Sequence, residues 1–140
     1  MKRLLVVIPF LVGGIGNAVA ACSTPYMTGS GASGVSTLLS GNTVCSPAGC
    51  SGASCQWQEQ HKSGGILADY KKGATDPKDP TKDIGAWSVA TTGPSNGKVT
   101  YTYTAGGSYT YDVKNNGANY SFCGPNGEFT FTVKSGLAGC

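Results

Sequence analysis

A strict two-residue alternation of apolar and polar side chains runs through the second half of the chain. In VTYTYTAGGSYTYDV, residues 99–113, Val and Tyr occupy one parity while Thr, Ser and Asp occupy the other. The same alternation predicts five successive strands at 86–91, 98–104, 108–114, 119–123 and 129–133. One apolar and one polar face in consecutive strands is typical of an antiparallel meander. Asn116-Gly117 marks a tight hairpin within it.

The first half of the chain has a weaker pattern. A short helical turn is expected around Leu38 and Leu39, where Gly41-Asn42 would stop it. Further strands are expected at 43–45, 56–61 and 66–71, followed by a long polar loop at 72–85. Together these segments predict an all-β fold, an up-and-down antiparallel meander of about seven or eight strands. Both a small closed barrel and a curled open sheet fit this count.

The N-terminal segment has the pattern of a secretory signal peptide. Lys2 and Arg3 precede the apolar run at 4–16, and Ala18-Val19-Ala20 fits the small-x-small cleavage pattern. We therefore expect cleavage after Ala20, a Gly/Ser-rich lead at 21–36 and a single β domain at 37–140, secreted or periplasmic. The run is too short for a transmembrane span, and none is expected in the mature chain. An alternative interpretation is an outer-membrane lipoprotein, because residues 19–22 also fit a lipobox that would attach lipid to Cys22.

The cysteines indicate a disulfide-stabilised fold. The chain has six of them, and in an exported protein they predict up to three disulfides. The candidates are Cys22, Cys45, Cys50, Cys55, Cys123 and Cys140. The short CSGASC loop favours a local Cys50–Cys55 bridge, which would leave the other four to tie the chain ends to the sheet. Lipidation of Cys22 would leave an odd number.

Charge makes several classes of partner improbable. Removal of Lys2 and Arg3 would leave eight basic and seven acidic residues, a net charge near +1 with no arginine. A nucleic-acid-binding surface or a polybasic membrane-binding patch would need a basic cluster that this composition lacks.

Metal binding and catalysis find little support. His61 is the one histidine, interpreted as polar surface, and zinc sites need clustered Cys or His. Asp76, Asp79 and Asp83 lie in a loop shared with lysines, interpreted as a solvated turn and not a calcium site. His61 with Glu59 or Asp69 would make an acid–base pair, but no motif selects it. We expect a non-enzymatic protein without metal or cofactor.

The aromatic residues supply the candidate contacts for a ligand. Alternation assigns the tyrosines from 101 to 120 mainly to the core. Trp57 is the aromatic expected to be exposed, because Gln56, Gln58 and Glu59 flank it. Trp57, Tyr70 and Trp87 are the possible ligand-contact residues, and the loops around Trp57 and at 72–85 are the expected location of function.

Several motifs carry resemblances to known groups. LLSGNTVC, GGILADYKKG, DPTKDIGAWSV and NYSFCG resemble an uncharacterised group of small exported bacterial proteins. Gly85-Ala86-Trp87 resembles the Gly-x-Trp that opens the lipocalin barrel, although too few residues follow it for eight strands. The similarity is therefore to a shorter calycin-like meander. The chain is also similar to small periplasmic lysozyme inhibitors, without a match to their inhibitory loop.

Three functions remain open. The first is an exported, non-catalytic module that binds an unknown small ligand or protein. The second is a secreted or periplasmic inhibitor of a hydrolase. The third is a surface or fibre component that assembles by strand-edge pairing. A closed barrel with an apolar cavity would favour ligand binding, whereas a filled core would count against it.

Overall fold

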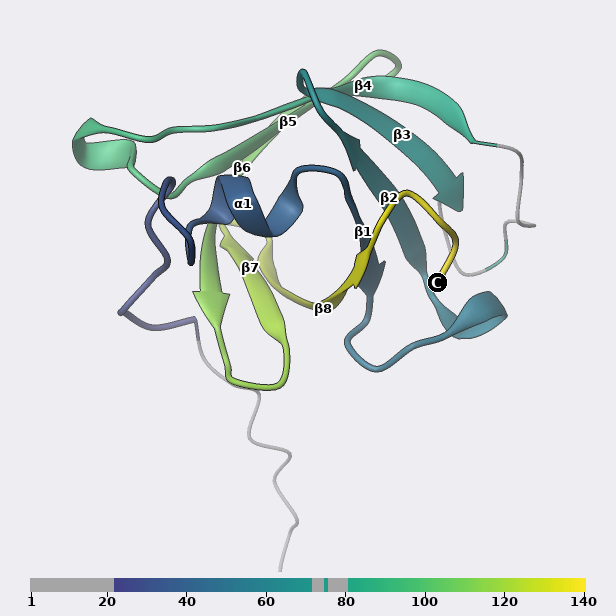
Figure 1. Ribbon diagram of the computed structural model, residues 1–140, viewed down its shortest axis with the longest axis horizontal. Coiled ribbons are helices and arrows are strands. Elements are labelled where there is room, and N and C mark those ends of the chain that lie inside the picture. The colour runs from purple at the N-terminus through teal and green to yellow at the C-terminus, as the bar shows by residue number, and fades with distance from the viewer. Residues whose placement is uncertain (1–21, 72–74, 76–80) are drawn as a thin grey trace, which may run out of the picture.

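A computed structural model describes residues 22–71, 75 and 81–140. Eight strands make up most of this part of the chain, with one short α-helix and two 3-10 turns (Figure 1). In chain order the elements are α1 (Val35–Leu39), β1 (Asn42–Ser46), η1 (Gly52–Ser54), β2 (Trp57–Lys62), β3 (Ile66–Lys71), β4 (Lys82–Val89), η2 (Gly93–Ser95), β5 (Val99–Tyr103), β6 (Ser108–Asn115), β7 (Tyr120–Gly124) and β8 (Gly127–Ser135). No helix in the described part of the chain is long and apolar enough to cross a membrane.

The strands form a closed barrel in simple meander order. Each strand pairs antiparallel with the next, and β1 closes the ring by pairing with β8 through Val44 opposite Val133. The predicted all-β, up-and-down antiparallel fold is confirmed, and the open question of closure is answered in favour of a barrel. Closure pairs each of the eight described strands on both sides, so none of these strands has an unpaired edge.

One boundary was predicted wrongly. The loop expected at 72–85 ends sooner, because β4 starts at Lys82 and includes the segment KDIG. Ile84 is half-buried and faces the interior. Gly85 of β4 lies opposite Tyr103 of β5. A Cβ at Gly85 would collide with the backbone carbonyl of Thr102, so the close approach of β4 and β5 requires glycine here.

The apolar parity of the strands points into the barrel, as alternation predicted. Leu67, Val99 and Val113 are fully buried at the end of the barrel where α1 lies. The helix contributes Val35 and Leu39, both also fully buried, to this cluster. The helical turn expected around Leu38 and Leu39 is thus present, and it closes one end of the barrel as part of the core.

Three disulfides attach the two chain ends and one loop to this barrel. Cys50 pairs with Cys55 inside the β1–β2 loop, as the short spacing predicted. The other pairs are Cys22–Cys123 and Cys45–Cys140, with sequence separations of 101 and 95 residues. The expectation that the remaining cysteines tie the ends to the sheet is confirmed.

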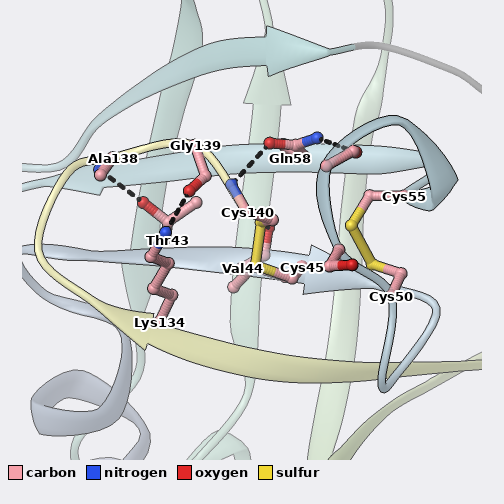
Figure 2. The surroundings of a disulfide bond; sticks show 12 residues. Thr43, Val44, Cys45, Cys50, Cys55, Gln58, Lys134, Ala138, Gly139 and Cys140 are labelled. Carbon is pink, nitrogen blue, oxygen red and sulfur yellow. Dashed lines mark hydrogen bonds between the residues drawn. A yellow bond between two sulfur atoms is a disulfide. The ribbon is translucent and has the colours of Figure 1, made fainter.

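The C-terminal tail crosses the outer face of β1 and β2 (Figure 2). The Gln58 side chain accepts a hydrogen bond from the Cys140 backbone N–H at 2.7 Å and donates one to the Gly52 carbonyl at 2.8 Å. Thr43 accepts a hydrogen bond from the Ala138 N–H at 3.2 Å. Both Gln58 and Thr43 are fully buried, so this part of the outer face is covered by protein and not by solvent.

Candidate ligand-binding cavity

The barrel contains a cavity of about 670 Å³. It lies at the end opposite α1, where β1 ends, β4 begins and β5 turns into β6. The residues that line it are Val44, Ser46, Trp57, Glu59, Lys82, Asp83, Ile84, Tyr101, Tyr103, Thr104, Ala105, Tyr109, Tyr111, Phe122 and Phe129. Its volume is within the range of roughly 300–1,000 Å³ that small-molecule sites occupy.

Seven of the fifteen residues that line the cavity are aromatic. Tyr101 and Phe122 meet edge to face with ring centroids 5.7 Å apart, and Tyr111 and Phe129 do so at 6.0 Å. Trp57 adds a further edge contact to Phe129 at 5.6 Å. These distances are typical of favourable aromatic pairs, so the rings hold one another in place around the empty space. The wall is therefore preformed and largely apolar.

Glu59 is the acidic side chain that faces into this aromatic wall. It lies on β2 between Trp57 and His61, which share its parity, and the Tyr103 hydroxyl donates a hydrogen bond to its carboxylate at 2.9 Å. Asp69 is its direct cross-strand partner on β3. Burial and, to a smaller extent, the nearby charge of Asp69 raise the pKa of Glu59 from 4.5 to about 7, against the lowering effect of the Tyr103 hydrogen bond.

His61 lies deeper on the same strand, below the cavity. It is fully buried, so the expectation of an exposed polar histidine was wrong. Its ring is held by a 2.9 Å hydrogen bond between Nε2 and the Tyr101 hydroxyl and by an edge contact with Trp87 at 5.2 Å. Burial lowers the pKa of His61 from 6.5 to about 4, so the imidazole is neutral at pH 7 and places no positive charge beside Glu59.

The mouth of the cavity carries exposed charges. Lys82 and Asp83 are both exposed at the start of β4. Asp83 lies in β4, not in the predicted polar loop, and makes an ion pair with Lys62 at 2.6 Å. Asp76 and Asp79 lie outside the described residues. Among the residues that are described, no cluster of His, Cys, Asp or Glu has the arrangement of a metal site.

The three predicted ligand-contact aromatics lie in different places. Trp57 is half-buried and lines the cavity. Trp87 belongs to the core, where its indole N–H donates to the Lys62 carbonyl at 3.1 Å. Tyr70 lies near Gly139, beside the C-terminal tail, and does not line the cavity. Trp57 is therefore the one of the three that the structure brings to the cavity.

The tyrosines of β5 and β6 have a different role from the one alternation assigned to them. Tyr101 is buried as expected, but Tyr103 and Tyr111 are half-buried and Tyr109 is 41% exposed. All four line the cavity. Their inward direction was predicted correctly, but their rings form the wall of a space that side chains do not fill. Alternation gives the direction of a side chain and carries no information on whether the interior is filled.

Glu59 was not selected from the sequence because β2 does not show the alternation of a strand with one solvated face. Gln58 and Gln60 point outward yet are buried, Gln58 beneath the C-terminal tail. Polar residues thus occupy both faces of β2. The available signal was the shared parity of Trp57, Glu59 and His61, which directs an acid into the barrel next to an aromatic ring.

Comparisons with models of protein families, with characterised proteins and with solved structures give no match to this chain.

Proposed function

We propose that this protein is a small exported, non-catalytic barrel that binds a small organic molecule inside its cavity. The observation that carries the proposal is the aromatic cavity of about 670 Å³, closed at one end by α1 and the buried cluster around it. A barrel stabilised only by its core would fill this space with side chains. A largely apolar cavity with a small number of polar groups is the usual form of a small-molecule site.

Export is supported by the pattern of the first 20 residues and by the three disulfides. Disulfides form and persist in secreted and periplasmic proteins. The pairing of Cys22 with Cys123 supports cleavage after Ala20 over lipidation, because lipid attachment would consume the sulfur that the disulfide uses. The ligand would therefore be met in the periplasm or outside the cell.

The same cavity favours ligand binding over the two other functions that the sequence leaves open. A hydrolase inhibitor would present a protruding loop and would need no internal space. A fibre component would need a free strand edge, whereas β1 and β8 pair with each other.

The test is titration of the oxidised protein with N-phenylnaphthylamine, a neutral apolar dye that fluoresces on leaving water. We expect saturable binding that is lost in Ala105→Trp, because Ala105 lines the cavity at the β5–β6 turn. Ala118→Trp is the matched control, since Ala118 is exposed in the β6–β7 turn at the opposite end of the barrel. Absence of saturable binding, or equal binding by both variants, would contradict the proposal.

A further inference from the structure

Five of the aromatic rings that line the cavity contact one another in a continuous series, which we call the aromatic belt. It begins at Trp57, whose ring meets Phe129 at a centroid distance of 5.6 Å, and Phe129 meets Tyr111 at 6.0 Å. Tyr111 in turn meets Tyr101 at 6.2 Å, and Tyr101 meets Tyr103 at 6.5 Å. The five rings come from β2, β5, β6 and β8. A molecule in the cavity therefore meets ring edges and faces from four strands.

Glu59 joins the two ends of the aromatic belt. It lies two residues from Trp57 on the same face of β2. Its Oε1 atom accepts a hydrogen bond at 2.9 Å from the hydroxyl of Tyr103, on a strand separated from β2 by β3 and β4. A carboxylate offers about four acceptor sites, and this bond uses one of them. Because Glu59 is half-buried and lines the cavity, its carboxylate can accept a further hydrogen bond from a molecule bound there.

Other polar groups of the cavity wall are placed differently from Glu59. The Ser46 hydroxyl donates to the backbone carbonyl of Thr130 at 2.8 Å. Lys82 and Asp83 are exposed at the mouth, where water competes for their hydrogen bonds. Glu59 is therefore a polar anchor among the rings, inside the rim of the cavity.

We propose that the cavity takes an aromatic molecule with a hydroxyl group, of the class of the alkylphenols, and that Glu59 accepts the hydrogen bond of that hydroxyl. This inference rests on the proposed function and specifies its ligand class. The ring of the ligand would pack against the aromatic belt in edge-to-face or offset contacts, which aromatic rings favour.

The carboxylate of Glu59 gives the cavity its selectivity for a hydrogen-bond donor. An apolar molecule of the same shape would expel water from the carboxylate without replacing the hydrogen bonds that the water made. A site built to hydrogen-bond a hydroxyl rejects analogues that lack it much more strongly than an apolar pocket rejects a change in size. The methyl ether of a phenol is such an analogue, because its oxygen accepts hydrogen bonds but has no proton to donate.

The experiment measures three related compounds by isothermal titration calorimetry: para-butylphenol, its methyl ether and its ring-saturated cyclohexanol. The buffer pH is kept above the Glu59 pKa of about 7, so the carboxylate is ionised and only accepts hydrogen bonds. We expect the ether to bind roughly 10- to 100-fold more weakly than the phenol, the usual effect of losing a hydrogen bond to a charged group. The cyclohexanol keeps a hydroxyl but has no aromatic ring, and should bind roughly 2- to 10-fold more weakly than the phenol.

Glu59→Gln is the decisive variant, because it keeps the shape of the side chain but replaces one acceptor oxygen by an N–H donor. The ratio of phenol to ether affinity should fall to about 1 in this variant. Glu128→Gln is the matched control, since Glu128 lies on the opposite parity of β8 and accepts a hydrogen bond from Ser121 at 2.6 Å, away from the cavity. The control should keep the wild-type ratio.

The outcomes separate the ligand class from the proposed function. If N-phenylnaphthylamine fails to bind the wild-type protein, the proposed function itself is wrong. If the dye binds but the phenol has no advantage over the ether or over the cyclohexanol, only the ligand class is overturned, and this comparison needs no variant. A phenol-to-ether ratio that survives in Glu59→Gln, or falls equally in Glu128→Gln, overturns the role of Glu59.

Discussion

Glu59→Gln should stabilise the barrel in alkaline solution and leave it unchanged in acid. The folded protein holds the Glu59 carboxyl where ionisation is unfavourable, with a pKa of about 7 against 4.5 in its ordinary state. Between these values the unfolded chain releases a proton that the folded chain keeps. The contribution of Glu59 to stability is therefore fully present below pH 4.5 and is lost as pH rises through about 7. Glutamine has no proton to release, so the variant avoids this loss.

The magnitude follows from the size of the shift. Each pKa unit corresponds to about 1.4 kcal/mol, so the shift of Glu59 corresponds to about 3 kcal/mol of unfolding free energy above pH 7. His61 acts in the opposite direction, because its pKa is lowered from 6.5 to about 4. Its contribution is present above pH 6.5 and is lost as pH falls through about 4. Between pH 4.5 and 6.5 the two effects oppose each other in the wild-type protein.

The assay is urea unfolding of the oxidised protein at several pH values, followed by tryptophan fluorescence. Between pH 4.5 and 6.5 we expect the effects of Glu59 and His61 on the unfolding free energy of the wild-type protein to cancel, so this free energy should change little with pH. In Glu59→Gln only the His61 effect remains, so the unfolding free energy should rise with pH over the same range. At about pH 8 the variant should exceed the wild type by about 3 kcal/mol. Glu128→Gln removes the same charge from the outer face and should give no such gain. A Glu59→Gln protein that is less stable than wild type at about pH 8, or a difference that does not change with pH, would refute the reasoning.

Three further changes test separate parts of the structure. Tyr103→Phe removes the hydrogen bond that lowers the pKa of Glu59, so this pKa, followed through the carboxyl ¹³C chemical shift, should move upward, and an unchanged pKa would count against the contact. Replacing Cys45 and Cys140 together by alanine should cost roughly 4 kcal/mol in urea unfolding and raise hydrogen exchange in the C-terminal tail, because their disulfide closes a loop with a separation of 95 residues. Gly85→Ala should cost at least about 2 kcal/mol, measured as a lower melting temperature by circular dichroism, because its Cβ would collide with the β5 backbone. A melting temperature equal to that of wild type would show that β4 and β5 are not so closely packed.

The fold could be predicted well where one face of a strand is solvated. From 98 to 133, alternation located β5 to β8 and gave the inward direction of residues such as Val99 and Phe131, both fully buried. The prediction was weaker at β4, where the polar segment KDIG enters a strand, because its side chains at the mouth remain exposed.

The candidate site was harder to predict because it depends on what surrounds β2. The tail that ends at Cys140 covers the outer face of β2, which conceals the alternation that would have identified Glu59 as an interior acid. The histidine two residues later was assigned to the surface for the same reason. The existence of a cavity depends on how far the rings on opposite walls stand apart, and this distance follows from strand number and closure, not from local sequence.

The most direct test of small-molecule binding inside the barrel is the set of intermolecular nuclear Overhauser effects between N-phenylnaphthylamine and the protein. We expect contacts from the rings of the dye to Tyr111, Phe122 and Phe129, which line the cavity. Contacts confined to an outer aromatic such as Tyr70, or none at dye concentrations that saturate the protein, would contradict binding inside the barrel.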